Sequence, residues 1–219
     1  MKSYESLANY CKEHNTTLVA VSKTKPNSAI EELYNQGQRI FGENRVQELV
    51  DKEATLPKDI AWHMIGHLQT NKVKYISAFV DMIQSGDRTS LLKEINKEAL
   101  KSQRKIDVLL QIKIAQEESK HGWDIAQLKE LLSNGLLEKY ENINFRGVMG
   151  MATFTDNETQ VSQEFKNLKS YFDQLQSQYF SNISTFDTIS MGMSGDYELA
   201  ISAGSNMVRV GSLLFGKRS

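Results

Sequence analysis

The chain has 219 residues, of which 40% are hydrophobic and 24% are charged. This length suits one large α/β domain or two small ones, and the composition is that of a globular protein with enough apolar residues for a full core. Lys and Arg (26) nearly balance Asp and Glu (27), so the net charge gives no reason to expect binding to nucleic acid or to an anionic membrane. The single cysteine, Cys11, excludes an internal disulfide framework and a multi-cysteine zinc site.

The N-terminal residues are polar, and no stretch approaches the roughly 18 consecutive apolar residues that cross a bilayer. We therefore expect a cytoplasmic protein without a membrane segment. Cys11 has helical spacing with Tyr4, Leu7 and Ala8, which indicates a half-buried packing residue rather than a nucleophile.

Short runs of β-forming residues alternate with stretches of helical period along the whole chain. A leading helix is expected over residues 3–14. Eight strands are predicted, at residues 18–21, 39–41, 62–65, 79–83, 106–114, 143–149, 186–190 and 207–210. A helical stretch follows each of them.

Residues that start or stop helices support several of these helical stretches. Ser28 and Glu31 have the spacing of a capping box, and Gly37 suits the end of the same helix. Asp87 and Asp124 are expected to cap the helices that follow the fourth and fifth strands.

Strict alternation of strands and helices favours a parallel sheet, because each parallel connection needs a crossover. Eight such units without an interdomain linker predict a single domain over residues 1–219, an α/β (β/α)8 TIM barrel with an extra N-terminal helix. One misread strand would restore an open, doubly wound sheet as the alternative.

Lys23 follows the first predicted strand, at the end of a barrel strand where functional residues are found. Alternation along the strand places Lys23 on the same side as Val19 and Val21, which would fill the barrel interior. An inward lysine beside a second cation, Lys25, favours the neutral and nucleophilic amine. The alternative is an ordinary surface turn before Pro26.

The loops after the seventh and eighth predicted strands are rich in glycine and serine. They contain Met191-Gly-Met-Ser-Gly195 and Gly211-Ser212. Small residues with available backbone amides bind phosphate at this end of many barrels, although they also make ordinary turns. Arg209 lies in the eighth strand, where it either reaches solvent or faces a polar site.

His63 and His67 are four residues apart, a spacing that suits a metal ion on a helix. However, His63 falls in a predicted strand, and no acidic residue completes the set at a suitable spacing. We therefore expect no metal site, with His63 as a core or rim residue.

Several short motifs occur in one order along the chain and together are highly specific. They are Ala20-Val-Ser-Lys-Thr-Lys-Pro26, Phe41-Gly-Glu-Asn44, His63-Met-Ile-Gly66, Leu68-Gln-Thr-Asn-Lys72, Arg146-Gly-Val-Met149, Ser190-Met-Gly-Met-Ser194, Ala203-Gly-Ser-Asn-Met-Val-Arg-Val-Gly-Ser212 and Phe215-Gly216. From about residue 16 onward, the chain closely resembles the pyridoxal phosphate homeostasis protein family, single-domain relatives of the alanine racemase barrel.

The resemblance implies a site for pyridoxal 5′-phosphate (PLP). It implies that Lys23 holds PLP as a Schiff base, that Arg209 lies near the pyridine nitrogen and that Asn44 lies at the cofactor rim. It assigns the phosphate to a further set of residues: Met193, Ser194, Gly211 and Ser212.

The resemblance also implies a role. A cation beside the ring nitrogen disfavours its protonation and makes the ring a weaker electron sink. The related racemases add a second β domain with a catalytic tyrosine, whereas this chain ends at Ser219. We therefore expect a non-catalytic PLP-binding regulator without catalytic residues, which indirectly affects amino-acid and keto-acid metabolism.

Two other functions remain open at this point: a stand-alone PLP-dependent racemase or lyase, and a phosphate-binding barrel without PLP. The expected partners are PLP and, as recipients, PLP-dependent apo-enzymes. We expect a monomer, because no exposed apolar stripe compels a dimer.

Overall fold

Eight parallel strands close into a barrel in the computed structural model, which describes residues 3–117 and 121–216. The strands are β1 (Thr17–Val21), β2 (Ile40–Glu43), β3 (Ala61–Met64), β4 (Met82–Gly86), β5 (Ile106–Gln111), β6 (Ile143–Met149), β7 (Thr188–Ser190) and β8 (Met207–Val210). Each strand pairs with its neighbours in chain order.

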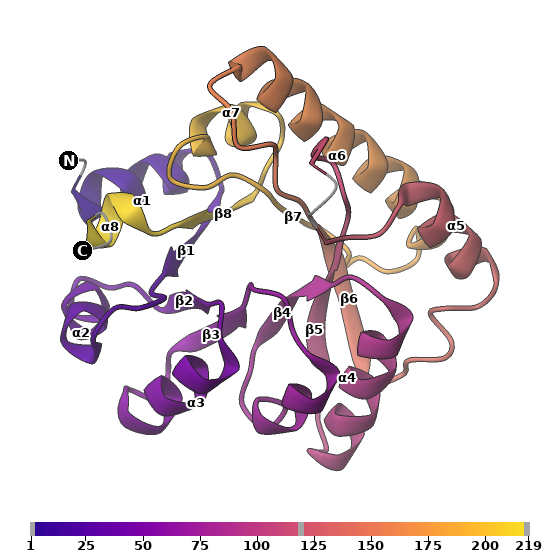
Figure 1. Cartoon of the computed structure of the whole chain (residues 1–219), viewed down its shortest axis with the longest axis horizontal. Coiled ribbons are helices and arrows are strands. Elements are labelled where there is room, and N and C mark those ends of the chain that lie inside the picture. The colour runs from indigo at the N-terminus through magenta and orange to yellow at the C-terminus, as the bar shows by residue number, and fades with distance from the viewer. Residues whose placement is uncertain (1–2, 118–120, 217–219) are drawn as a thin grey trace.

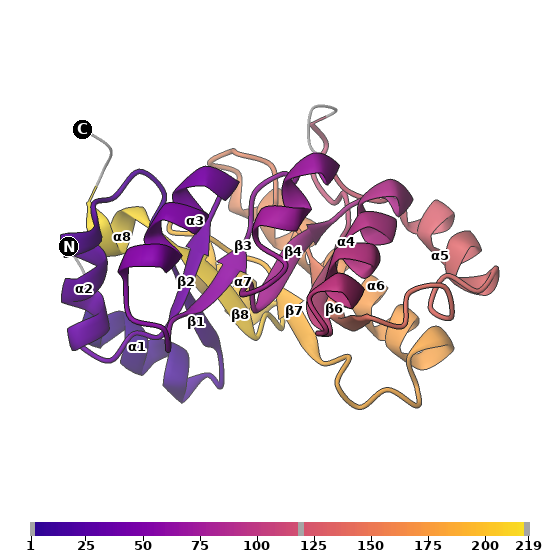
Figure 2. The ribbon, with the colours of Figure 1, turned by 90° about the horizontal axis from the view of Figure 1, so that it is seen from below.

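Helices surround this barrel (Figures 1 and 2). They are α1 (Tyr4–Glu13), α2 (Asn27–Asn35), α3 (Val46–Thr55), the 3₁₀ helix η1 (Thr70–Tyr75), α4 (Thr89–Lys101), α5 (Ile125–Ser133), α6 (Glu158–Tyr179), α7 (Tyr197–Ser202) and α8 (Ser212–Phe215).

The first and last strands close the barrel. β1 pairs in parallel with β8 over four residue pairs, including Val19 with Arg209 and Ala20 with Val210. The closure confirms the predicted (β/α)8 barrel and rules out the open, doubly wound alternative. It also brings the end of the first strand beside the end of the last, although they are nearly 190 residues apart in sequence.

The described residues form three core clusters. A large cluster lies between the sheet and the helices and includes residues of α2 to α7. A separate cluster draws one buried residue from each of five strands and none from a helix: Val19, Met82, Leu109, Met149 and Met207. Because side chains alternate along a strand, these five fill the barrel interior, as expected for Val19.

Helix α1 packs beside the C-terminal part of the chain, and Figure 1 shows it next to α8. Leu7 and Cys11 of α1 are buried against Leu18 and Val208, with Leu213 and Leu214 packed on the same cluster. Burial raises the pKa of the Cys11 thiol to about 11, so Cys11 is an inert packing residue.

The fourth strand was misplaced by three residues: it was predicted at 79–83 and runs from Met82 to Gly86. The apolar residues Ile76 and Val80 are buried but lie outside the strand, and the amides of Phe79 and Val80 both donate to Ile76 O. The strand continues instead through polar Gln84 and Ser85, which are fully buried. Hydrophobicity alone missed this part of the strand because Gln84 is polar and bonds His63 and Ser190 inside the barrel.

Two predicted helix caps were wrong and one is confirmed. Helix α2 begins at Asn27 after Pro26 with no side-chain cap, so Ser28 does not form the capping box. The N-cap residue of α4 is Arg88, and the Asp87 carboxylate pairs with Arg88 and His67 instead. Asp124 does cap α5, accepting from two backbone amides.

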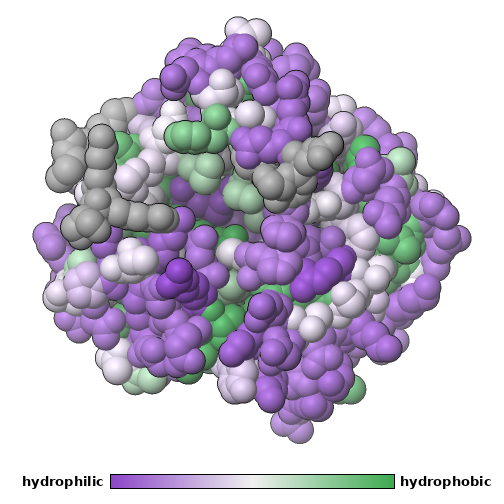
Figure 3. Space-filling view, in the orientation of Figure 1, coloured by the Kyte–Doolittle hydropathy of each residue, from purple (hydrophilic) through white to green (hydrophobic). Residues whose placement is uncertain are grey.

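The fifth predicted strand was too long. β5 ends at Gln111, and Ile112 lies beyond the strand in an isolated bridge to Trp123. Among the described residues, no helix combines the length and apolarity that a membrane span requires. The face shown in Figure 3 is mainly hydrophilic, with hydrophobic residues in small separate groups.

Candidate functional site

A cavity of about 400 Å³ opens at the carboxyl ends of the strands, within the roughly 300–1,000 Å³ typical of small-molecule sites. Residues from the loops after β1, β2, β3, β6, β7 and β8 line it. They are Val21, Lys23, Lys25, Asn44, Ile65, Met151, Phe154, Met193, Ser194, Gly195, Asp196, Arg209, Gly211, Ser212 and Gly216. The wall is therefore mixed, with an apolar portion and several convergent polar groups.

Lys23 lies on the cavity wall directly beyond β1. Val19 is inside the barrel, and Val21 and Lys23 line the cavity, so the alternation predicted along this strand is correct. Lys23 is half-buried. Lys25 also lines the cavity, and its Nζ donates to Phe215 O at 2.9 Å.

A buried polar network holds the loop that carries Lys23. Ser22 Oγ donates to Glu43 Oε1 at 2.6 Å, and Lys52 Nζ donates to the same oxygen at 2.6 Å and to Ser22 O at 2.9 Å. One residue further along, Thr24 N donates to Glu48 Oε2 at 2.7 Å. The residues on both sides of Lys23 are therefore fixed to β2 and α3.

The loop also contains backbone strain. Thr24 has φ +64°, in the left-handed region that a β-branched residue rarely occupies. Its amide is held there by Glu48, which compensates for the unfavourable conformation. Strain of this kind turns the chain sharply just after Lys23.

The two charged groups of this network, Glu43 and Lys52, are both buried in the protein interior. Glu43 is fully buried, and that burial raises the pKa of its carboxyl group, while the Lys52 and Ser22 hydrogen bonds lower it in part. Glu43 Oε2 accepts no hydrogen bond from any residue that the structure describes. Lys52 is thus the main counter-charge of a carboxylate that cannot reach water.

Arg209 faces the cavity from β8 and is 4% exposed. Its Nη1 donates to Ser190 Oγ at 2.6 Å and its Nη2 to Gly150 O at 3.0 Å. Burial lowers the pKa of Arg209 to about 10, with Asp196 acting in the opposite direction. The guanidinium therefore remains a cation at neutral pH, with its orientation fixed.

Arg209 is one end of a hydrogen-bonded chain across the barrel. Ser190 Oγ donates to Gln84 Oε1 at 2.6 Å, and Gln84 Nε2 lies 3.0 Å from His63 Nδ1. Burial lowers the pKa of His63 to about 4, so the ring is neutral at pH 7. Since Gln84 presents its oxygen to Ser190, its amide donates to His63 Nδ1, which leaves the imidazole proton on Nε2.

The glycine- and serine-rich loops after β7 and β8 meet at the cavity. Gly211 N donates to Ser194 Oγ at 3.1 Å, which joins the two loops directly. Met193 N donates to Asp196 Oδ1 at 2.5 Å, so Asp196 closes the turn of the first loop. Gly192 has φ +92°, and a Cβ there would lie 2.5 Å from Ala200 Cβ, so this turn requires glycine.

Asn44 extends from β2 to the cavity rim. Its Oδ1 is buried and accepts no hydrogen bond within the described part of the chain. Gly66 lies against its backbone, where an added Cβ would be 2.4 Å from Asn44 O. An acceptor left in this way beside a cavity is a position for a ligand's donor.

All seven candidate site residues predicted from sequence line this one cavity. They are Lys23, Asn44, Met193, Ser194, Arg209, Gly211 and Ser212. The supporting residues Glu43, Lys52, Gln84 and Ser190 were not predicted. A charged residue on the apolar face of α3 was a usable signal for Lys52, whereas nothing local marked Gln84.

Comparison with known proteins identifies the family of this chain. Residues 2–219 match the family model described as "Alanine racemase, N-terminal domain". A pyridoxal phosphate homeostasis protein of Aquifex aeolicus is 42% identical over 207 residues, which cover 94% of this chain and 89% of the relative. That of Escherichia coli K12 is 37% identical over 206 residues, with 92% and 86% covered.

Solved structures give the same result. PipY of Synechococcus elongatus PCC7942, determined with PLP bound, superposes with a TM-score of 0.86 at 34% identity, covering 97% of this chain and 99% of PipY. Alanine racemase of Bartonella henselae shares the fold at a TM-score of 0.68 and 17% identity, where this chain spans 59% of that enzyme. The chain thus belongs to the pyridoxal phosphate homeostasis protein family, within the larger family defined by the alanine racemase N-terminal domain.

Proposed function

We propose that this chain binds PLP in the cavity at the carboxyl ends of the strands and acts in intracellular PLP homeostasis as a non-catalytic binding protein. The observation that carries the proposal is the convergence of a lysine, a buried arginine and two serine-containing loops on one cavity. A PLP-bound relative at 34% identity supports it. PLP supplies an aldehyde that forms a reversible covalent bond with an amine.

The residues present fit such a ligand. Lys23 presents the amine that would hold PLP as a Schiff base, and Ser22 and Thr24 fix the backbone on either side of it. Asn44 offers a buried amide oxygen with no partner among the described residues, which suits a donor on the ligand. The cavity volume and its partly apolar wall suit an aromatic ring.

The phosphate would be held by Met193, Ser194, Gly211 and Ser212. Helix α8 has only four residues, so its dipole adds little, and serine hydroxyls and backbone amides would provide the contacts. Lys23, Lys25 and Arg209 outnumber Asp196 on the cavity wall, so the local charge favours an anionic ligand.

Arg209 would face the pyridine nitrogen. A cation fixed there by Ser190 and Gly150 disfavours protonation of the ring. Among the described residues, the ionisable side chains on the cavity wall are Lys23, Lys25, Arg209 and Asp196. No tyrosine or histidine is among them to act as an acid–base partner for Lys23, which favours binding over turnover.

Release to PLP-dependent apo-enzymes would require a second amine to displace Lys23. Lys25 lines the same cavity, so it is a candidate relay, which first has to leave Phe215 O. We place this activity in a cytoplasmic monomer.

The assignment of Lys23 is tested by borohydride reduction of the PLP-loaded protein, followed by peptide mapping. The pyridoxyl group is expected on Lys23 in the wild type and in Lys25→Ala, which is the matched control. Lys23→Ala is expected to lose the adduct and the visible absorbance of the bound cofactor. An adduct on Lys25, or on neither lysine, would overturn the assignment.

The non-catalytic role needs a separate test against a racemase or lyase. Loaded protein is incubated with individual amino acids in heavy water, and α-deuteration is followed by mass spectrometry. The expected result is no saturable exchange above that of free PLP. Rapid exchange that disappears in Lys23→Ala would show an enzyme instead.

A further inference from the structure

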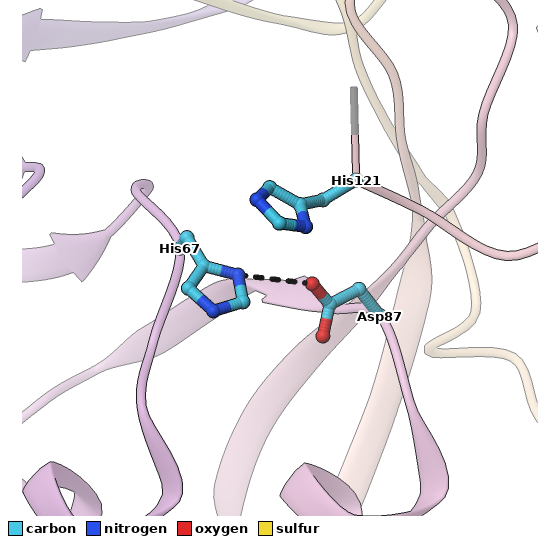
Figure 4. Close-up of side chains that lie close together, drawn as sticks. All are labelled: His67, Asp87 and His121. Carbon is cyan, nitrogen blue, oxygen red and sulfur yellow. Dashed lines mark ion pairs between the residues drawn. The ribbon is translucent and has the colours of Figure 1, made fainter. Parts of the chain in front are cut away.

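Three side chains with metal-binding atoms meet at the carboxyl end of the barrel, outside the cavity described above. His67 follows β3, Asp87 follows β4, and His121 precedes α5 (Figure 4). One ring nitrogen from each histidine and one carboxylate oxygen all lie within 4.8 Å of one another. The three residues come from successive βα loops, so the barrel topology alone brings them together.

The first two ligand atoms are already at the separation that a bound ion requires. His67 Nδ1 lies 3.3 Å from Asp87 Oδ2, longer than the roughly 2.7–2.9 Å of a charge-assisted hydrogen bond. Two ligands at about 2.0–2.1 Å from a tetrahedral Zn²⁺ are about 3.3–3.4 Å apart. An ion between these two atoms therefore fits the separation of the His67–Asp87 pair without moving either side chain.

His121 offers the third candidate ligand atom, from the loop after β5. Its ring stacks on that of His67 with centroids 4.1 Å apart, and in Figure 4 it lies across from the His67–Asp87 pair. Both imidazoles are exposed, and a change of the His121 rotamer is the movement that would bring its nitrogen nearer to the other two ligand atoms.

Hydrogen bonds hold the backbone from His121 to Trp123. Gln111 Nε2 donates to His121 O at 2.9 Å, and Trp123 Nε1 donates to Gly86 O at 2.7 Å, beside Asp87. Gly122 has φ +139°, and a Cβ there would lie 2.7 Å from Lys113 N. These contacts tie the loop after β5 to the residue before Asp87 and fix the distance between the two loops.

The carboxylate is also oriented. The Asp87 side chain is 4% exposed, and Arg88 donates to its other oxygen, Oδ1. Arg88 is in turn held by Leu68 O at 2.7 Å, in the same loop as His67. Carboxylates that bind metal ions are typically held by such second contacts, and Oδ2 is left to face the two imidazoles.

We propose that His67, Asp87 and His121 form a binding site for a divalent transition-metal ion of the Zn²⁺ class. Two imidazole nitrogens and one carboxylate oxygen are a donor set that Zn²⁺ favours, with the fourth position open to water. The proposal departs from the expectation of no metal site, which considered only His63 and His67. His63 is buried in the barrel and bonded to Gln84, so it takes no part.

The test is titration of tag-free, PLP-free protein with Zn²⁺ by calorimetry and with Co²⁺ by visible absorption. One equivalent is expected to bind saturably, with Co²⁺ showing the bands of a four- or five-coordinate site. His67→Asn, Asp87→Asn and His121→Asn are each expected to weaken binding by at least about tenfold, since each removes one of three ligands.

His14→Asn is the matched control, because His14 is an exposed histidine at the C-cap of α1, away from the cluster. It is expected to leave Zn²⁺ binding unchanged. Far-ultraviolet circular dichroism of each variant shows that the fold is kept. Absence of saturable binding, or equal weakening by His14→Asn, would overturn the proposal, as would a loss confined to one of the three variants. PLP uptake is measured separately, so failure of either assignment is distinguishable from failure of the other.

Discussion

Lys52 Nζ lies 2.6 Å from Glu43 Oε1, and the two side chains are 8% and 0% exposed. The same ammonium donates to Ser22 O, one residue before Lys23. A lysine of α3 thus neutralises a carboxylate of β2 and at the same time positions the loop of β1. The buried Lys52 therefore helps to position the backbone of Lys23, the lysine proposed to hold the cofactor.

Replacing Lys52 with Met is expected to lower the free energy of unfolding by about 3–5 kcal/mol, because it leaves Glu43 buried without its counter-charge. Urea denaturation measures the change. Lys58→Met is the matched control: Lys58 forms an exposed pair with Glu53 at 2.7 Å, and such pairs contribute about 0–1 kcal/mol.

A double variant, Glu43→Leu with Lys52→Met, is expected to recover much of the loss, since it removes both buried charges. A loss below about 1 kcal/mol for Lys52→Met alone would contradict the role given to this pair.

Gly66→Ala is expected to weaken PLP binding while the protein still folds. A Cβ at residue 66 would lie 2.4 Å from Asn44 O, so the loop bearing Asn44 must move, at a cost of about 1–3 kcal/mol in stability. The measurement pairs thermal unfolding with the absorbance of bound PLP.

Gly37→Ala is the matched control. Gly37 has φ +103°, and nothing lies within 4 Å of an added Cβ there, so this variant should lower stability and leave PLP binding intact. Equal PLP affinity in Gly66→Ala and the wild type would show that Asn44 is not needed.

Ser194→Ala and Ser212→Ala are each expected to weaken PLP about tenfold or more, because a hydrogen bond to a charged group contributes about 1.5–3 kcal/mol. Pyridoxal, which lacks the phosphate, should bind both variants and the wild type alike. Ser202→Ala, at an exposed serine of α7 that donates to Glu198 O, serves as the control. If both ligands were weakened equally, the two serines would act on the fold of the loops rather than on the phosphate.

The sequence predicted the strands of ordinary hydrophobic pattern well. β6 and β8 match their predicted bounds, and the parity that placed Lys23 with Val19 and Val21 is correct. These features depend on alternation within one strand, which is local information. β4 was misplaced because its interior residue Gln84 is polar. When the hydrogen-bond partners are unknown, a polar residue in the sequence indicates a loop rather than a strand.

Those partners are distant in sequence. Gln84 bonds Ser190 across 106 residues and His63 across 21, and Glu43 meets Ser22 only after the sheet has formed. The residues of the cavity wall could be named because they belong to ordered motifs at strand ends. The network beneath the wall, and the meeting of His67, Asp87 and His121, follow from strand order and register, which one sequence does not reveal.

His63 makes stability depend on pH. Burial lowers its pKa to about 4 in the folded protein from 6.5, so between these values the unfolded chain binds more protons than the folded one. Stability from this residue is therefore complete above pH 6.5 and is lost as the pH falls toward 4, by roughly 3 kcal/mol in all. Glu43 acts in the opposite direction, because burial raises its pKa in the folded protein. As the pH falls, the folded state therefore takes up this proton before the unfolded chain does.

The contribution of His63 is isolated by comparing urea denaturation of the wild type and His63→Gln from pH 7 to pH 4.5. The variant should show the smaller acid-induced loss, His14→Gln should match the wild type, and identical slopes for all three proteins would mean that the buried imidazole is protonated without cost.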